Sequence, residues 1–137
     1  MNEQEQMDLV ARNVFMHHNH MEVSHLERDR AVVALDIVPD SLNPYGALHG
    51  GAYYTMADCA GGAACRTDGR YYVTLHGSLD FLHAARSGRV EAEARVRHRG
   101  RTTCLVEVEI TGEGGRLLAR GSFNFFCLGE QLPPAHN

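Results

Sequence analysis

The stretch NPYGALHGGAYYTMADCAGGAAC, residues 43–65, decides the fold. It begins with Asn43, Pro44 and Gly46, which are turn-forming residues and predict an irregular loop. The second half consists mainly of alanine, glycine and other residues with small or apolar side chains. This composition predicts one long buried helix, from position 50 to about position 66, that the chain enters directly from the loop.

One carboxylate, Asp58, stands in the middle of the predicted helix. An unpaired buried carboxylate is costly, so its presence among small apolar residues calls for a reason. Gly61 and Gly62 follow it within one turn, and their missing side chains would let another backbone approach the helix closely. The helix therefore carries both a packing surface and a candidate reactive group.

Segments rich in β-branched residues, or with alternating polarity, flank this helix and predict strands. Two precede the helix, and four follow it in what we expect to be a meander. The predicted strands are 21–27, 30–39, 71–82, 89–98, 103–110 and 116–128. Runs of strands around a single helix predict the α+β class, with an antiparallel sheet of five to six strands wrapped around the helix.

The chain length of 137 residues suits one domain, and we expect residues 1–137 to form it. Apolar positions near the start predict a lead-in helix within residues 1–14. The segment 129–137 is expected to be a frayed tail. We see no internal repeat and no low-complexity linker.

The charge and composition exclude several classes of function. The net charge is −4, so nucleic acid is not an expected partner. All 13 basic residues are arginine, which excludes Schiff-base chemistry and a phosphate-binding lysine loop. The sequence has no apolar run long enough to span a membrane and no secretory signal, so we expect a cytoplasmic protein.

Neither the cysteines nor the histidines predict a metal site. Cys59, Cys65, Cys104 and Cys127 lie in apolar contexts without a Cys-x-x-Cys pair, and we expect them to be buried free thiols. The run HHNH at 17–20 fits no common zinc pattern. We therefore expect no metal and no cofactor.

The helix entrance reads Asn-Pro-x-Gly-x-x-His-Gly-Gly from Asn43 to Gly51, and Asp58 follows His49 by nine residues. With the order of two strands, one helix and four strands, this motif resembles the hotdog-fold acyl-CoA thioesterases, and among them the phenylacetic-acid-degradation (PaaI-like) thioesterase family. The segment DFLHAA at 80–85 is similar to that family's Asp-Phe-Leu-Arg-Pro-Ala strand end, with histidine and alanine replacing the arginine and proline. The resemblance covers nearly the whole chain.

The resemblance implies a helix wrapped by the sheet, an acyl-CoA substrate and an active site at a subunit interface. Two subunits would pair edge to edge as a homodimer, often within a homotetramer. The positions that match the family's functional residues are Asn43, His49, Gly50 and Asp58. Thr74 matches a position where a hydroxyl helps to orient water.

Physical chemistry gives the helix entrance a role in thioester hydrolysis. A helix N-terminus offers unpaired N–H groups and a partial positive charge, and Gly50 and Gly51 would let a carbonyl oxygen approach them. We interpret the Gly50 amide as an oxyanion hole, where one donor is worth about 3–4 kcal/mol. The alternative is a simple tight helix start. His49 would brace the loop or bond the substrate carbonyl region, and the Asn43 amide would pin the loop or His49.

Asp58 is our candidate general base for water, or a nucleophile on the acyl carbon. The alternative is an exposed or internally paired aspartate. Thr74 should share one strand face with His76, Ser78 and Asp80, and as a strand threonine it needs no function. We rank its contribution below that of Asp58.

Three arginines near a predicted hairpin turn, Arg97, Arg99 and Arg101, are candidates for binding the phosphates of coenzyme A, because arginine suits bidentate phosphate contacts. The alternative is that they form a solvated hairpin end.

The leading hypothesis is hydrolysis of acyl-CoA to a free acid and CoA. A hotdog hydratase or dehydratase would need a different acid–base pair, and the absence of a second histidine or glutamate near Asp58 counts against it. A non-catalytic acyl-CoA binding or sensing domain is the other alternative, and the intact Asp58 argues against it. Asp58 lies two turns beyond Gly50, about 12 Å along the helix, so we expect each site to combine residues of two subunits.

Overall fold

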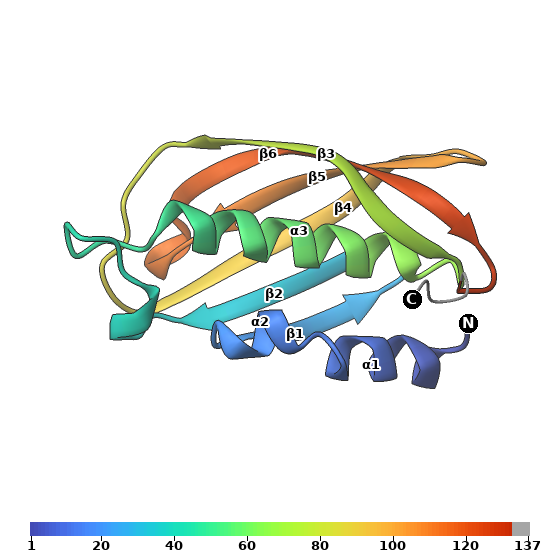
Figure 1. The fold of residues 1–137 in the computed structure, drawn as a ribbon. Coiled ribbons are helices and arrows are strands. Elements are labelled where there is room, and N and C mark those ends of the chain that lie inside the picture. The colour runs from blue at the N-terminus through green and yellow to red at the C-terminus, as the bar shows by residue number, and fades with distance from the viewer. Residues whose placement is uncertain (133–137) are drawn as a thin grey trace.

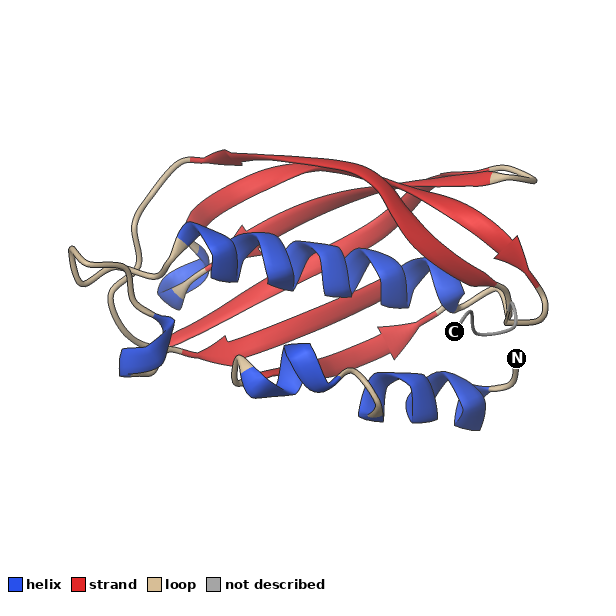
Figure 2. Cartoon of the chain, in the orientation of Figure 1, coloured by secondary structure: helices blue, strands red, loops and turns tan. Residues whose placement is uncertain are grey.

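One 17-residue helix, α3 (Gly50–Arg66), lies against a six-stranded antiparallel sheet in the computed structural model, which describes residues 1–132 (Figure 1). The sheet curves around the helix, as the view coloured by secondary structure also shows (Figure 2). This arrangement confirms the predicted hotdog fold, with six strands. They are β1 (Met21–Glu27), β2 (Arg30–Asp36), β3 (Tyr71–Phe81), β4 (Arg89–Arg99), β5 (Thr103–Thr111) and β6 (Leu117–Gly129).

The strand order differs from the predicted meander. In the sheet the order is β1-β2-β4-β5-β6-β3. Only β4, β5 and β6 follow one another as a meander, whereas β3 crosses over and pairs with β6. The expectation of a four-strand meander was wrong because alternation along a strand reveals which face is buried but not which strand lies beside it. The crossover leaves β3 as an edge strand of 11 residues.

Alternation along the strands builds the core between the sheet and α3. On β4 and β5 the inward residues are almost completely buried, and the outward ones are mainly charged. The buried inward residues are Val90, Ala92, Ala94, Cys104, Val106, Val108 and Ile110. Their burial against the alanine-rich face of α3 removes apolar surface from water, which is the main driving force for folding.

Gly61 does not serve the purpose expected of it. A Cβ at Gly61 would lie 2.9 Å from two ring carbons of Phe125 and 3.0 Å from a methyl of Val106. Gly61 therefore admits the sheet's own side chains and not another backbone. A Cβ at Gly62 would meet chiefly the far end of the Arg66 side chain, at 3.1 Å.

The N-terminal segment forms two short helices where one lead-in helix was expected. They are α1 (Glu3–Ala11) and α2 (Val14–His18). Asn2 and Asn13 cap their N-termini by accepting backbone N–H bonds, as asparagine commonly does. Within residues 1–132, no helix combines the length and the apolar character needed to cross a bilayer.

The end of β2 also differs from the prediction. Strand β2 ends at Asp36, before the short 3-10 helix Pro39–Ser41, whereas the sequence pattern suggested a strand up to residue 39. A second 3-10 turn, Glu113–Gly115, joins β5 to β6. Of the tail predicted at 129–137, residues 133–137 lie outside the described residues.

The contrast between Gly61 and Gly62 gives a test of the packing. Alanine improves helix propensity equally at both positions, by about 1 kcal/mol. Only Gly61→Ala overpacks the core, which typically costs about 1–3 kcal/mol. Denaturant unfolding should therefore show Gly61→Ala to be less stable than Gly62→Ala by about that amount. Equal free energies of unfolding for the two variants would contradict the tight packing of α3 at Gly61 against β5 and β6.

Candidate active site

The loop before α3 is closed by Asn43. Its side-chain Oδ1 accepts the backbone N–H groups of Tyr45 and Ala47, at 2.9 and 3.1 Å. The backbone N–H of Asn43 donates to the Ala47 carbonyl at 2.7 Å. The side chain thus fixes the loop, which is one of the two roles considered for it, and it makes no direct contact with His49 among the hydrogen bonds of residues 1–132.

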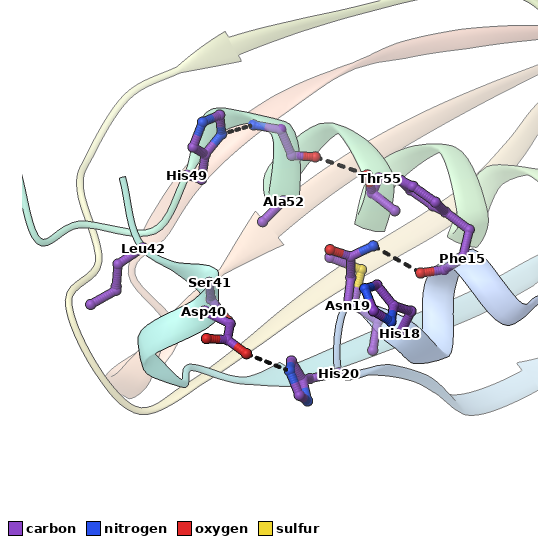
Figure 3. Close-up of a pocket in the computed structure, with 12 residues that line it drawn as sticks. Phe15, His18, Asn19, His20, Asp40, Ser41, Leu42, His49, Ala52 and Thr55 are labelled. Carbon is purple, nitrogen blue, oxygen red and sulfur yellow. Dashed lines mark hydrogen bonds and ion pairs between the residues drawn. The ribbon is translucent and has the colours of Figure 1, made fainter. Parts of the chain in front are cut away.

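His49 is the N-cap of α3. Its Nδ1 accepts the N–H of Gly51 at 2.8 Å, and its backbone N–H donates to the Ser41 carbonyl at 2.9 Å (Figure 3). Because Nδ1 is an acceptor here, the neutral ring carries its proton on Nε2. His49 therefore holds the helix entrance in place and keeps one N–H donor on an exposed ring.

The Gly50 amide is free at the first helical position. A residue there has no intrahelical acceptor for its N–H, and no hydrogen bond among residues 1–132 uses it. A Cβ at residue 50 would come no closer than 3.7 Å to the ring of Phe81, so this position has room for a small side chain. Gly51 differs, because its N–H already bonds His49.

Two cavities open beside this entrance. One, of about 760 Å³, is lined by His49 and Gly51 together with residues of α2, β1 and the 3-10 helix (Figure 3). The other, of about 320 Å³, is lined by Gly50, Phe81 and neighbouring residues. The N-terminus of α3 thus borders two cavities.

Asp58 and Thr74 meet where α3 lies beside the edge strand β3. The Thr74 hydroxyl donates to Oδ1 of Asp58 at 2.6 Å. Asp58 is half-buried and Thr74 is exposed, so the pair faces outward from this chain. No hydrogen bond among residues 1–132 uses Oδ2 of Asp58, which leaves that oxygen available.

A bulge in β3 brings Thr74 to the helix. Thr74 pairs with Phe125 and His76 with Asn124, so the register shifts between them. Thr74 therefore faces α3, while His76 faces away. The expectation that Thr74 shares a face with His76, Ser78 and Asp80 was wrong, because simple alternation takes no account of the extra residue in a bulge.

Within one chain the candidate residues form two separate groups. Asn43, His49 and Gly50 lie at the helix entrance, and Asp58 pairs with Thr74 two turns further on. The rise of a helix puts Gly50 and Asp58 about 12 Å apart along the axis. Neither Asp58 nor Thr74 lines either of the two cavities at the entrance.

The three candidate arginines differ in their surroundings. Arg99 is bound internally: its guanidinium contacts Asp29 at 2.6 Å and Asp68 at 2.7 Å, and donates to the Cys65 carbonyl at 2.9 Å. Burial acts to lower the pKa of Arg99, but the hydrogen bond to Asp29 and the negative charge of Asp68 outweigh it and raise this pKa. Arg97 pairs with Glu107 on the surface, and Arg101 is exposed. Only the latter two can reach a ligand without breaking an internal network.

The thiol next to Asp58 in sequence does not offer a competing nucleophile. Burial raises the pKa of Cys59 to about 11, so the thiol stays protonated at neutral pH, and the thiol form is unreactive. Cys65 and Cys104 are fully buried. In the part of the chain that the structure describes, no three histidine, cysteine or acidic side chains gather as metal ligands would.

Two residues that support the entrance could not be predicted from the sequence. Ser41 accepts the His49 N–H, and Arg86 donates to the Tyr45 carbonyl at 3.1 Å. Both contacts depend on how the loop folds back on itself and on the segment after β3. Neither residue type nor spacing predicts such contacts.

Comparison with known proteins identifies the family that shares this sequence and fold. The model of the thioesterase superfamily matches residues 45–119. A putative esterase of Pseudomonas aeruginosa is 40% identical over 77 residues, which are 53% of each chain, so this chain matches about half the length of that relative. The acyl-coenzyme A thioesterase PaaI of Escherichia coli is 29% identical over 100 residues, 72% of this chain and 71% of that one.

A solved structure extends the comparison. A hypothetical thioesterase of Streptococcus pneumoniae, determined with coenzyme A, superposes with a TM-score of 0.79 at 29% identity, over 87% of this chain and 98% of that one. Two single-residue variants of a hypothetical thioesterase from the same organism have also been solved. One replaces a threonine by alanine, and the other replaces an aspartate by alanine. The two replaced positions are 16 residues apart, which is also the separation of Asp58 and Thr74 in this chain.

Proposed function

Because the chain belongs to the thioesterase superfamily and is a thioester hydrolase, we propose that it hydrolyses an acyl-CoA thioester to a carboxylic acid and CoA at a site shared by two subunits. The observation that carries this proposal is the Asp58–Thr74 pair, with one carboxylate oxygen held and the other open. A general base or nucleophile needs this combination of a fixed position and a free lone pair.

In the proposed reaction Asp58 works at the acyl carbon. As a base, it takes a proton from the water whose oxygen bonds to that carbon. As a nucleophile, it bonds to the carbon itself, and water then cleaves the resulting anhydride. In both routes the carbon–sulfur bond breaks, and the CoA thiolate leaves and is protonated. The Thr74 hydroxyl holds the carboxylate and helps to orient the water.

The negative charge that develops on the carbonyl oxygen needs a hydrogen-bond donor, and the free N–H of Gly50 is that donor. An amide at a helix N-terminus is fixed in direction and is aided by the helix dipole. His49 supports this amide by capping the helix, and Asn43 supports it by closing the loop. Gly51, which lies at the same turn, leaves room for the substrate.

We propose that the Gly50 of one subunit acts with the Asp58 of another, because about 12 Å of helix separates them in one chain. The edge strand β3 supplies a pairing surface. Among residues 1–132 it pairs with β6 alone, and it exposes Val73 and Leu75 at 47% and 56% of their full accessibility. A long edge strand with exposed apolar side chains is a template for pairing. A homodimer, or a homotetramer built from two dimers, would cover it.

For the CoA phosphates we retain Arg97 and Arg101. Arg101 is exposed at the β4–β5 turn, and the partner of Arg97 is a surface glutamate that a phosphate can displace at little cost. We propose a structural role for Arg99, because its guanidinium pairs with Asp29 and Asp68 and removing one partner from a buried ion pair typically costs about 3–5 kcal/mol.

The proposal predicts a rank order for Asp58 and Thr74. Asp58→Asn keeps the shape but removes the base, and should lower kcat on CoA esters by about 10² or more. Thr74→Ala leaves the carboxylate in place and should cost less. Thiol release, followed with a chromogenic thiol reagent, measures both. Near wild-type turnover of folded Asp58→Asn, or a larger loss from Thr74→Ala, would contradict the assigned roles.

Proline at position 50 tests the oxyanion hole. Proline lacks the N–H but suits the first helical position, and His49 has the extended backbone that precedes proline, with φ −62° and ψ 137°. Gly50→Pro should therefore fold, yet lose about 10²–10³ in kcat. Gly50→Ala is the matched control, since it adds a side chain but keeps the amide. Equal losses in the two variants would show that the N–H is not used.

A further inference from the structure

His83 follows the end of β3, at the position where histidine replaces an arginine of the family's strand end. Its backbone N–H donates to the Leu118 carbonyl at 3.1 Å, and its own carbonyl accepts the Tyr53 hydroxyl at 3.3 Å. Strand β6 and helix α3 therefore both hold the backbone of this residue. The proposed function leaves this histidine without a role.

The ring of His83 is held in one tautomer. Its Nδ1 atom lies 2.9 Å from the carbonyl oxygen of Leu117. A carbonyl oxygen only accepts hydrogen bonds, so Nδ1 carries the proton of the neutral ring and Nε2 carries a lone pair. No hydrogen bond among residues 1–132 uses Nε2 of His83. The neutral ring is thus a fixed hydrogen-bond acceptor with an available lone pair.

His83 lines the cavity of about 320 Å³ that Gly50 also lines. Most of the wall of this cavity is apolar, with the side chains of Leu48, Phe81 and Leu82 among others. Because the Gly50 N–H is the proposed donor to the thioester carbonyl, the atoms on one side of that thioester pass along this wall. His83 is therefore placed to contact either the acyl group or the pantetheine arm of the substrate.

The polar groups of the cavity decide between these two arms. Besides His83, two lining side chains carry oxygen atoms, and both oxygens are engaged: Oδ1 of Asn43 accepts two loop N–H groups, and the Tyr53 hydroxyl donates to the His83 carbonyl. Among the lining side-chain acceptors, Nε2 of His83 is the one that makes no hydrogen bond within residues 1–132. A chain that suits this cavity is therefore mainly apolar and offers one N–H donor.

We propose that this cavity binds the pantetheine arm of the substrate and that Nε2 of His83 accepts the N–H of the amide nearest the sulfur. This inference rests on the proposed function. In a CoA ester an ethylene link joins the sulfur to a secondary amide, so the arm is apolar beside the thioester and then presents an N–H group. A hydrocarbon acyl chain has no such donor. His83 thus positions the coenzyme side of the thioester against the Gly50 amide.

The test compares two thioesters that carry the acyl group of the best CoA substrate. One is the N-acetylcysteamine ester, which reproduces the pantetheine arm through its first amide. The other is its ketone isostere, in which a CH2 group replaces the N–H. Wild-type protein should have a kcat/KM about three- to tenfold higher for the amide ester, which is the effect of one hydrogen bond between neutral groups. Equal kcat/KM values would overturn this inference and leave the proposed function intact.

Two variants of His83 separate the roles of its ring nitrogens. His83→Asn keeps an N–H donor near the position of Nδ1, for the bond to Leu117, but has no atom at the position of Nε2. His83→Gln places a carbonyl oxygen near the position of Nε2. The ratio of the two kcat/KM values should fall to about one in His83→Asn, and His83→Gln should keep most of it. An unchanged ratio in folded His83→Asn would show that another group accepts the N–H, which contradicts the proposal.

The matched control is His25→Asn. His25 lies on β1, at the opposite edge of the sheet from β3, and its ring makes only an exposed ion pair with Glu27. This variant should keep the wild-type ratio of the two kcat/KM values. A fall in the ratio as large as in His83→Asn would mean that the effect is not specific to the cavity, and the proposal would be wrong.

The remaining outcomes also distinguish the two proposals. If no CoA ester is hydrolysed, the proposed function fails and this inference fails with it. If CoA esters are hydrolysed but the N-acetylcysteamine ester is not, recognition lies elsewhere in the coenzyme and only this inference fails. If the His83 variants do not fold, a crystal structure of the wild-type protein with a non-hydrolysable CoA thioether decides. The nitrogen of the amide nearest the sulfur should then lie within about 3.2 Å of Nε2, and any other position of this nitrogen rules the contact out.

Discussion

The constraint on which the rest depends is the rise of an α-helix. Gly50 and Asp58 lie on one straight helix, about 12 Å apart along its axis, so the Gly50 amide and the Asp58 carboxylate of one chain are too far apart to contact the same thioester carbonyl group. In the proposed site, a single chain therefore holds two half-sites, one at the entrance of α3 and one in its middle. The loop, the cap and the edge strand each position one of these halves.

The edge strand β3 links the chemistry to assembly. Its bulge turns Thr74 toward α3, where the hydroxyl holds Asp58, while the same strand keeps one edge unpaired. Pairing across that edge would cover the exposed apolar side chains and place a second helix beside the first. In this account, activity and subunit pairing come from the same strand, so a monomer would be folded but inactive.

The sequence predicted the fold well because periodicity and small-residue composition are local signals. The single helix at 50–66 and all six strands lie within a few residues of their predicted positions. The errors concern non-local facts. The neighbour of β3 depends on a crossover, the face of Thr74 depends on a bulge, and Gly61 faces Phe125 because of how closely the helix lies on the sheet.

The candidate site shows the same division. The motif singled out Asn43, His49, Gly50 and Asp58. In the structure Asn43, His49 and Asp58 each make defined hydrogen bonds, whereas the Gly50 amide makes none among residues 1–132. The internal network of Arg99 had no signal in the sequence, because whether an arginine is paired depends on residues that are distant along the chain.

Hybrid dimers test the shared site most directly. Asp58→Asn and Gly50→Pro subunits, each inactive alone, are mixed after gentle dissociation, and the hybrids are isolated by means of two different affinity tags. In a symmetric pair, one site of the hybrid then carries both defects and the other carries none. The account predicts half the wild-type thioesterase activity per hybrid dimer. No recovery in verified hybrids would place the whole site within one chain and contradict it.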